Sequence, residues 1–356
     1  MKNRLKLFRK YAAKKLLDKK TRQHKVFDIR KIKSILFLRY DNKIGDMVIS
    51  TLMFREIKKQ FPDIKIYVLC GKDSGEIIRK NPYVDEIVEL KSGFFSRFAI
   101  FRYLKNKKID AAIDFYQFKQ RPLKLLMLRI IDPGYLIGFH KQDYNMYDMS
   151  VDCDINEMHI TKRYEHFMNM IGVEVKSLKY DIFIDAKQEE KAKSLMVKSK
   201  NNILINPFAA SKHRSFSFYK LQNLINHINK IKEFNVSVYV LCVNSSLNLL
   251  KGLKGAEIVS VDSIQESAAL VKYCDCVITP DTAIVHIAAA FNKRMISIYL
   301  DFSSKEERND KVWAPGYDNA VQLCVDTKNG MFEDDIKSIN NNLIVEALLN
   351  FFKGIN

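Results

Sequence analysis

The sequence lacks several patterns, and each absence narrows the class of protein. No apolar run reaches the roughly 18 residues that a membrane-spanning helix needs, and the N-terminus lacks the apolar centre of a secretory signal. Neither G-x-G-x-x-G nor G-x-x-x-x-G-K-[ST] occurs, which disfavours nicotinamide enzymes and P-loop proteins. The six cysteines show no metal-type pairing, so we expect reduced core thiols in a cytoplasmic protein.

Acidic residues are in the minority, at 41 against 59 Lys and Arg, which gives a net charge of +18. Residues 1–33 hold fourteen Lys/Arg and two Asp, so they carry +12 and leave +6 for the rest of the chain. Leu5, Phe8, Ala12 and Leu16 form an apolar stripe at helical spacing. We interpret residues 1–33 as a basic amphipathic arm for an anionic membrane surface. A solvated tail and a nucleic-acid-binding arm are the alternatives, although no base-reading motif accompanies the charge.

The chain of 356 residues, with 47% hydrophobic residues, is sufficient for two cores. From Ser34 onward, strand-like and helical segments alternate, which predicts parallel sheets covered on both faces. We expect one α/β domain over residues 34–180, a linker over 181–201, and a second α/β domain over 202–330. A terminal helix is expected within residues 331–356, over Glu333 to Phe352.

Residues 34–61 predict a strand, a loop and a helix. Ser34 to Tyr40 is a short apolar run, and helical periodicity follows the polar turn after it. Gly45 and Asp46 therefore lie where the loop becomes the helix, whose unpaired N–H groups can hold an anion or anchor a carboxylate. A simple first-turn acid explains Asp46 equally well at this point.

Residues 276–300 repeat the same order of elements. A strand over Cys276 to Thr279 leads through a Pro-Asp turn into a small-residue helix that starts at Thr282. Asp281 and Thr282 lie at the N-terminus of this helix, and His286 follows Thr282 by one turn on the same face.

Together these stretches resemble glycosyltransferase family 9, the bacterial heptosyltransferases of lipopolysaccharide core synthesis. The matching residues are Ile44-Gly45-Asp46-Met47-Val48 and, further on, Asp281-Thr282, His286 and Ala288-Ala289-Ala290. Partial matches are Asn206-Pro207, Arg214-Ser215-Phe216-Ser217 and Trp313-Ala314-Pro315. The resemblance runs in order over most of residues 34–325.

The resemblance implies two doubly wound Rossmann-like domains facing a cleft, the GT-B architecture. It implies an acceptor-binding domain over 34–180 and a nucleotide-sugar-binding domain over 202–330, with the C-terminal helix packing back on the first. The implied reaction is inverting, metal-independent transfer of heptose or a related sugar from a nucleotide-diphosphate donor, expected to be ADP-heptose, without a cofactor. The implied acceptor is the lipid-linked inner core of lipopolysaccharide or lipooligosaccharide, reached from the inner face of the bacterial inner membrane.

Such a reaction needs a base for the acceptor hydroxyl and positive potential for the departing diphosphate. The resemblance assigns the base to Asp46. Arg214 aligns with a phosphate-binding position, and a guanidinium can bind phosphate with two hydrogen bonds. The expected donor-binding residues are Asn206, Ser211, Lys212, Arg214, Asp281, Thr282, Ala283 and His286. The expected acceptor-binding residues are Asp114, Lys119, Arg121, His159 and Arg163.

Some residues depart from the family pattern. Ala283 stands where the family has Gly, and the loop after the strand ending at Cys242 lacks the usual glycines and acid. These departures leave open a catalytically degenerate member that acts as a binding protein. Asp152-Cys153-Asp154 resembles the metal-binding D-x-D of another glycosyltransferase fold. We discount it because two alternating α/β units are typical of the metal-independent architecture.

Overall fold

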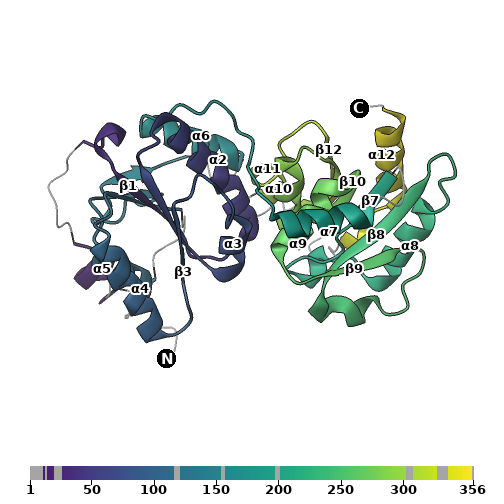
Figure 1. The fold of residues 1–356 in the computed structure, drawn as a ribbon, viewed down its shortest axis with the longest axis horizontal. Coiled ribbons are helices and arrows are strands. Elements are labelled where there is room, and N and C mark those ends of the chain that lie inside the picture. Colours follow the sequence, from purple (N-terminus) through teal and green to yellow (C-terminus); the bar gives the residue numbers. More distant parts are fainter. Residues whose placement is uncertain are drawn as a thin grey trace. The chain divides into compact units, whose positions relative to one another are not determined.

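The computed structural model describes residues 11–12, 14–19, 26–115, 121–153, 157–196, 201–301, 308–326 and 336–354 (Figure 1). Its contacts divide the chain into two units. The first comprises Met1–Lys43, Leu52–Asp154 and Lys162–Leu178, and the second comprises Ile44–Thr51, Ile155–Thr161 and Lys179–Asn356. Each unit is built around one six-stranded sheet.

The sheet of the first unit has the order β3-β2-β1-β4-β5-β6, and its neighbouring strands are parallel. Its strands are β1 (Ser34–Arg39), β2 (Lys65–Cys70), β3 (Glu86–Glu89), β4 (Ala111–Asp114), β5 (Tyr135–Phe139) and β6 (Met149–Val151). Every residue of the central strand β1 is buried. Burial on both faces explains why this strand is a nearly continuous apolar run in the sequence.

Helices cover both faces of this sheet. They are α2 (Ile44–Gln60), α3 (Lys72–Ile77), α4 (Phe94–Asn106), α5 (Pro122–Ile131) and α6 (Ile160–Met170). On one face, α4 and α5 pack side chains such as Leu104 and Leu128 against Leu36 and Leu38 of β1. On the other face, a cluster of phenylalanines connects β1, β4 and β5 with α2 and α6. Its members are Phe37, Phe54, Phe115, Phe139 and Phe167.

Described parts of the N-terminal segment contact the first unit. Arg129 of α5 donates hydrogen bonds to the carbonyls of Leu17 and Lys19. Ile29 and Ile32 are buried. An independent arm over residues 1–33 is therefore wrong for residues 29–33, because the apolar side chains of Ile29 and Ile32 belong to the core. Leu5 and Phe8 lie outside the described residues.

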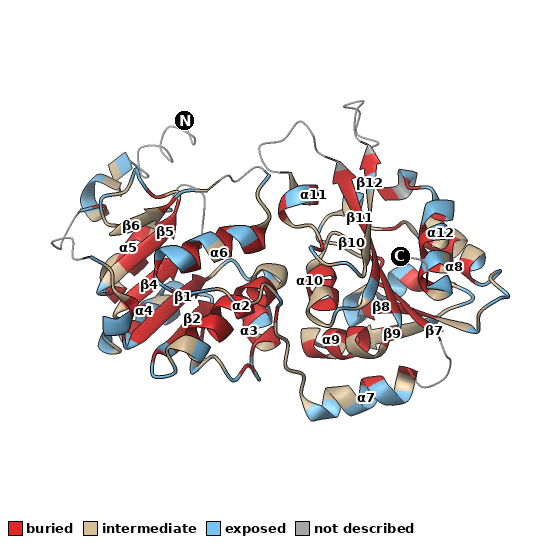
Figure 2. Ribbon diagram, turned by 90° about the horizontal axis from the view of Figure 1, so that it is seen from above, coloured by how far each residue is buried: buried red, intermediate tan, exposed pale blue. Residues whose placement is uncertain are grey.

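The sheet of the second unit has the order β12-β11-β10-β7-β8-β9, again with parallel neighbours. Its strands are β7 (Asn201–Ile205), β8 (Val236–Val243), β9 (Glu257–Val261), β10 (Cys276–Pro280), β11 (Arg294–Asp301) and β12 (Ala320–Asp326). Its helices are α7 (Ala186–Met196), α8 (Phe218–Ile228), α9 (Ile264–Tyr273), α10 (Ala283–Ala290), α11 (Asn309–Val312) and α12 (Asn341–Lys353). Figure 2 shows α8 and α12 on one face of the sheet, with α9 and α10 on the other.

The terminal helix α12 corrects one expectation. It packs against α8 and β11 of the second unit, where we expected it to pack back on the first. The reason is its apolar stripe Ile344, Ala347, Leu348 and Phe351, which completes the core of the second sheet. The helix begins later than Glu333, because Asn340 is its N-cap and accepts a hydrogen bond from the backbone N–H of Asn342.

The cysteines are mostly in the core. Cys70, Cys242, Cys274 and Cys276 are buried, Cys153 is half-buried and Cys324 is exposed. Burial raises the pKa of the Cys70 and Cys274 thiols to about 12. Among the residues that the structure describes, no helix is long and apolar enough to span a membrane.

Candidate active site

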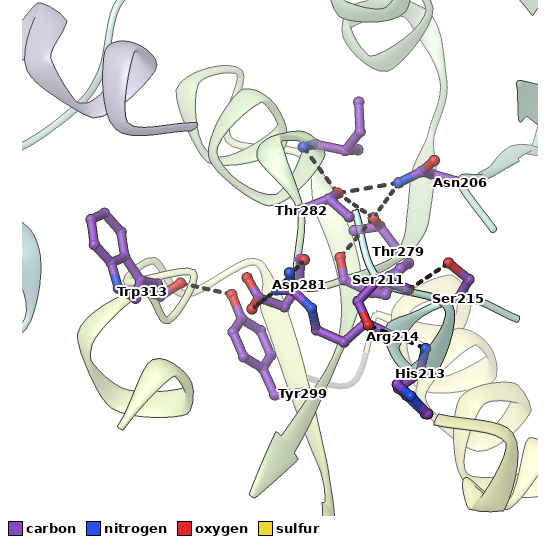
Figure 3. Close-up of polar contacts among 12 residues, drawn as sticks. Asn206, Ser211, His213, Arg214, Ser215, Thr279, Asp281, Thr282, Tyr299 and Trp313 are labelled. Atoms are coloured by element: carbon purple, nitrogen blue, oxygen red, sulfur yellow. Dashed lines mark hydrogen bonds and ion pairs between the residues drawn. The ribbon is translucent and has the colours of Figure 1, made fainter. Parts of the chain in front are cut away.

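The candidate site of the second unit lies where β7 and β10 end side by side. Parallel sheets commonly bind ligands at this carboxyl edge. Asn206, just after β7, donates hydrogen bonds from Nδ2 to the hydroxyl oxygens of Thr279 (3.0 Å) and Thr282 (3.2 Å) (Figure 3). These two hydroxyls are themselves 3.1 Å apart. The loops after the two strands are therefore held together by one small polar network.

The same network fixes the start of α10. Thr282 is its N-cap, and its hydroxyl oxygen accepts a hydrogen bond from the backbone N–H of Ile284 at 3.2 Å. Ala283 is the first helical residue. The free N–H groups of a helix's first turn and its dipole favour a negatively charged group. This end of α10 can therefore receive an anion such as a phosphate.

Arg214 and Asp281 meet at this edge. Arg214 closes the 3₁₀ turn Lys212–Arg214, which Ser211 caps by accepting a hydrogen bond from the N–H of His213. The Arg214 guanidinium lies 2.7 Å from the Asp281 carboxylate, and both side chains are partly exposed (Figure 3). The guanidinium has five N–H donors, so one carboxylate contact leaves it able to bind a second acceptor. Lys212 is exposed on the same turn.

The first turns of α2 belong to the second unit by their contacts. A Cβ atom placed on Gly45 would lie 2.8 Å from Cδ2 of His286 and 3.6 Å from Cα of Ala283. A glycine at this position therefore allows the start of α2 to approach the start of α10 closely. The next residue is Asp46, a half-buried acid in the first turn of α2. The geometry thus places the predicted base beside the helix N-terminus that can receive the anion.

His286 is a buried, neutral residue. Its side chain is only 4% exposed and its ring lies 6.2 Å from that of Tyr180 and 6.3 Å from that of Trp313, centroid to centroid. Burial, with a smaller contribution from His159, lowers the pKa of His286 to about 3. Nδ1 has no hydrogen-bond partner among the described residues. His286 therefore packs against the position of Gly45 at the start of α2.

The acceptor candidates differ in their surroundings. Asp114, at the end of β4, is fully buried and its carboxylate accepts hydrogen bonds from the hydroxyls of Tyr40 (2.7 Å) and Tyr147 (2.6 Å). Burial and the neighbouring Asp114 raise the pKa of Tyr147. Arg121 is exposed just before α5, and Lys119 lies outside the described residues. Asp114 is therefore an anchor for two tyrosines.

His159 and Arg163, two further acceptor candidates, lie in different surroundings. His159 precedes α6, its Nδ1 lies 2.7 Å from the Thr161 hydroxyl, and its Nε2 lies 3.0 Å from the carbonyl of Ala314. A carbonyl only accepts, so Nε2 carries the proton and holds the segment after Trp313. Arg163 lies within α6 and is completely buried, in place of the solvated surface residue we considered.

Sequence reasoning missed several polar residues near the strand ends. Arg39 is the last residue of β1 and is buried, with its guanidinium 4.3 Å from the centre of the Phe115 ring. Lys141 is buried just after β5, and its amine donates to the carbonyl of Phe139 at 2.9 Å. The Tyr299 hydroxyl donates to the Trp313 carbonyl at 2.7 Å. Arg39 could have been identified from the sequence, because it is a charged residue at the end of an apolar run.

The D-x-D segment is only partly described. The Asp152 carboxylate is exposed and lies 3.5 Å from Nδ1 of His140, while Asp154 is outside the described residues. Within the described ranges, no group of three or more His, Cys, Asp or Glu residues is arranged to hold a metal ion.

Comparison with known proteins identifies the family of this chain. The family profile of glycosyltransferase family 9 (heptosyltransferase) matches residues 97–342, more than half of the chain. The provisionally named lipopolysaccharide heptosyltransferase 4 of Escherichia coli K12 is 25% identical over 308 residues, covering 85% of this chain and 85% of that protein. The lipopolysaccharide core heptosyltransferase OpsX of Haemophilus influenzae is 22% identical over 278 residues, covering 75% of this chain and 79% of that protein.

Solved structures share the fold. A family 9 glycosyltransferase of Veillonella parvula superposes with a TM-score of 0.75 at 14% identity, covering 90% of this chain and 97% of that one. The ADP-heptose heptosyltransferase II of Escherichia coli gives a TM-score of 0.69 at 16% identity, with 90% and 99% covered. The expected GT-B architecture of two Rossmann-like domains is confirmed. By its profile match, this chain belongs to glycosyltransferase family 9, the heptosyltransferases, and is a glycosyltransferase.

Proposed function

We propose that this enzyme transfers heptose, or a closely related sugar, from ADP-heptose to the inner core of lipopolysaccharide or lipooligosaccharide. One observation carries the proposal. Gly45 lies against His286 and Ala283 at the start of α10, and Asp46 is the next residue, which supports one site for a base and an anion-binding helix end. The names of the heptosyltransferase relatives support the choice of sugar and acceptor.

The proposed mechanism is a single displacement with inversion. Asp46 removes the proton of the acceptor hydroxyl, whose oxygen attacks the anomeric carbon of the sugar from the side opposite the diphosphate. A positioned general base typically accelerates such a step by about 10²–10⁴-fold. The first-turn N–H groups of α10 and the guanidinium of Arg214 stabilise the negative charge that develops on the departing diphosphate. This positive potential is why we propose a metal-independent reaction.

The ion pair of Arg214 with Asp281 suggests how the donor is arranged. A diphosphate oxygen binds the guanidinium more favourably when the Asp281 carboxylate turns toward the sugar, because two anions then do not share one cation. Asp281 can accept hydrogen bonds from sugar hydroxyls in that position. Asn206, Ser211, Lys212 and Thr282 surround the same edge and complete the proposed donor site.

The acceptor is proposed to be lipid-linked and to be reached from the cytoplasmic face of the inner membrane. The +12 charge of residues 1–33 supports this location, because basic segments are attracted to anionic leaflets. Arg121 is the exposed candidate for an acidic group of the acceptor. The proposal includes no nucleic-acid partner.

A catalytically degenerate binding protein is the second candidate, because Ala283 adds a methyl group at the first position of α10 where the family has glycine. A measurement of ADP-heptose turnover with a heptose-deficient core acceptor distinguishes an active transferase from a binding protein. We expect turnover by the native enzyme, unchanged by EDTA. Asp46→Asn should keep ADP affinity and lose at least about 10²-fold in turnover. ADP binding without turnover in the native protein would favour the degenerate member, and full turnover in Asp46→Asn would remove Asp46 from the mechanism.

A further inference from the structure

Helix α4 exposes a group of phenylalanines that no part of the candidate site uses. Phe94, Phe95 and Phe98 are 61%, 86% and 40% exposed. Their rings touch one another, with centroids 5.8 Å apart for Phe94 and Phe95 and 6.5 Å apart for Phe94 and Phe98. We call these three residues the aromatic patch. A contiguous exposed apolar group of this kind commonly marks an interaction surface.

The patch is not required for packing within the first unit. Phe101 and Leu104 already supply the buried face of α4 and contact the core of the first sheet. The patch lies on the first turns of the helix, before these residues. Exposure of the three rings to water is unfavourable. Binding to a surface that buries these rings would therefore be favoured.

The charged residues of the segment that carries the patch are all basic. Residues 90–109 contain six Lys or Arg and no Asp or Glu. Lys91, Arg102 and Lys105 are exposed, while Lys107 is paired with Glu86 at 3.0 Å. Aromatic side chains surrounded by basic residues fit the interface of an anionic bilayer, where rings enter the headgroup layer and cations meet lipid phosphates.

The basic N-terminal segment is attached to the same helical layer. Helices α4 and α5 lie side by side on one face of the first sheet (Figure 1). Arg129 of α5 holds the carbonyls of Leu17 and Lys19, and Leu16 nearby is exposed. The aromatic patch and the described end of the N-terminal segment at Leu17 and Lys19 are therefore both attached to this layer of the first unit.

We propose that the aromatic patch inserts into the interfacial layer of an anionic membrane, and that the bases around it bind the lipid headgroups. The proposal extends the proposed function by stating where the enzyme meets the membrane that carries its acceptor. Binding to vesicles needs neither donor nor acceptor. Membrane insertion of the aromatic patch and the proposed sugar transfer can therefore be tested independently.

The first test measures binding of the full chain to phosphatidylethanolamine vesicles that contain phosphatidylglycerol. The triple variant Phe94→Ser/Phe95→Ser/Phe98→Ser should bind at least about 100-fold more weakly, because three rings no longer leave water. The matched control is Phe218→Ser/Tyr219→Ser on α8, where the two side chains are 42% and 78% exposed. The control should bind within about twofold of the native protein. Equal binding by the triple variant and the native protein would overturn the proposal.

The second test detects insertion directly and does not depend on the triple variant folding. Phe95→Trp and Tyr219→Trp are compared on vesicles whose acyl chains carry bromine, a contact quencher of tryptophan fluorescence. Phe95→Trp should be quenched beyond the native background, and Tyr219→Trp should not. No added quenching of Phe95→Trp, or preferential binding of the native protein to duplex DNA over the vesicles, would contradict the proposal. The second result would assign the patch and its bases to nucleic acid.

Discussion

At the scale of single residues, His286 links the packing of the site to its chemistry. Its ring fills the space that Gly45 leaves open, and burial lowers its pKa to about 3. The ordinary pKa of an unfolded histidine is about 6.5. Between these two values the unfolded chain binds a proton at this residue and the folded protein does not. The contribution of His286 to stability is therefore fully present above about pH 6.5 and is lost as the pH falls toward 3.

We therefore predict that the native protein loses stability on acidification faster than His286→Gln does. Between pH 7.5 and pH 5, the native protein should lose about 2 kcal/mol more of its unfolding free energy than His286→Gln loses. The reason is that the contribution of His286 changes by about 1.4 kcal/mol per pH unit below pH 6.5. Denaturant unfolding at the two pH values measures it, and the other titrating groups cancel in the comparison. Equal losses in both proteins would mean that His286 is protonated in the folded state.

At the scale of elements, the contact between the starts of α2 and α10 determines where Asp46 lies. Gly45→Ala should destabilise the protein by about 1–3 kcal/mol through overpacking against His286, offset by about 0.5–1 kcal/mol of helix propensity. The same change in a His286→Ala background should cost less, because the ring that the new Cβ meets is absent. A double-mutant cycle of unfolding free energies measures this coupling. Equal costs in both backgrounds would show that the two helix starts do not touch.

The elements that carry the site were predictable from local sequence, and the edge strands β6, β9 and β12 were not. The apolar runs of β1 and β10, each followed by a polar turn and a helical pattern, gave both strand ends and both helix starts. Strand β9 is short and only alternately buried, and β12 consists mainly of partly exposed residues. Edge strands of this kind have a weak hydrophobic pattern, so our expectation omitted them.

The site itself was predictable only in part, because local sequence patterns reveal helix starts and do not reveal contacts between distant residues. Spacing along the chain placed Asp281 and Thr282 at a helix N-terminus. The ion pair between Arg214 and Asp281, and the hydroxyl network of Asn206, join residues more than 60 positions apart. Local patterns contain no information about such contacts. The hydrogen bonds that Asp114 accepts from Tyr40 and Tyr147 are likewise absent from the local pattern, since these residues lie 74 and 33 positions away from it.

At the scale of the whole molecule, the charge is concentrated in the N-terminal segment, but the structure changes how much of it can be removed. Ile29 and Ile32 belong to the core, and the backbone N–H of Lys33 donates to the Asp110 carboxylate at 2.9 Å. Removal of residues 1–33 would therefore damage the fold as well as the charge. Residues 1–10 contain five Lys or Arg and no acid, and they precede every described contact.

We predict that deletion of residues 1–10 weakens binding to anionic vesicles by at least about tenfold, since each basic residue near an anionic leaflet contributes about 1 kcal/mol. Thermal unfolding and turnover on a short, water-soluble acceptor should remain unchanged. Co-sedimentation at physiological salt measures the binding. The deletion of residues 1–33 serves as the comparison and should lower the unfolding temperature. Undiminished sedimentation after the shorter deletion would assign membrane binding to the rest of the chain.

The distribution of the cysteines has a practical consequence for following the reaction. Four thiols are buried, and the raised pKa values of Cys70 and Cys274 keep them protonated at neutral pH, so maleimide reagents that attack thiolates will reach them slowly. Cys324 is exposed on β12, directly across the strand pair from Tyr299 of β11. Tyr299 in turn holds the Trp313 carbonyl. A fluorophore attached to Cys324 would thus be two strands away from β10, which leads into the proposed donor site, and would report nucleotide binding without any engineered cysteine.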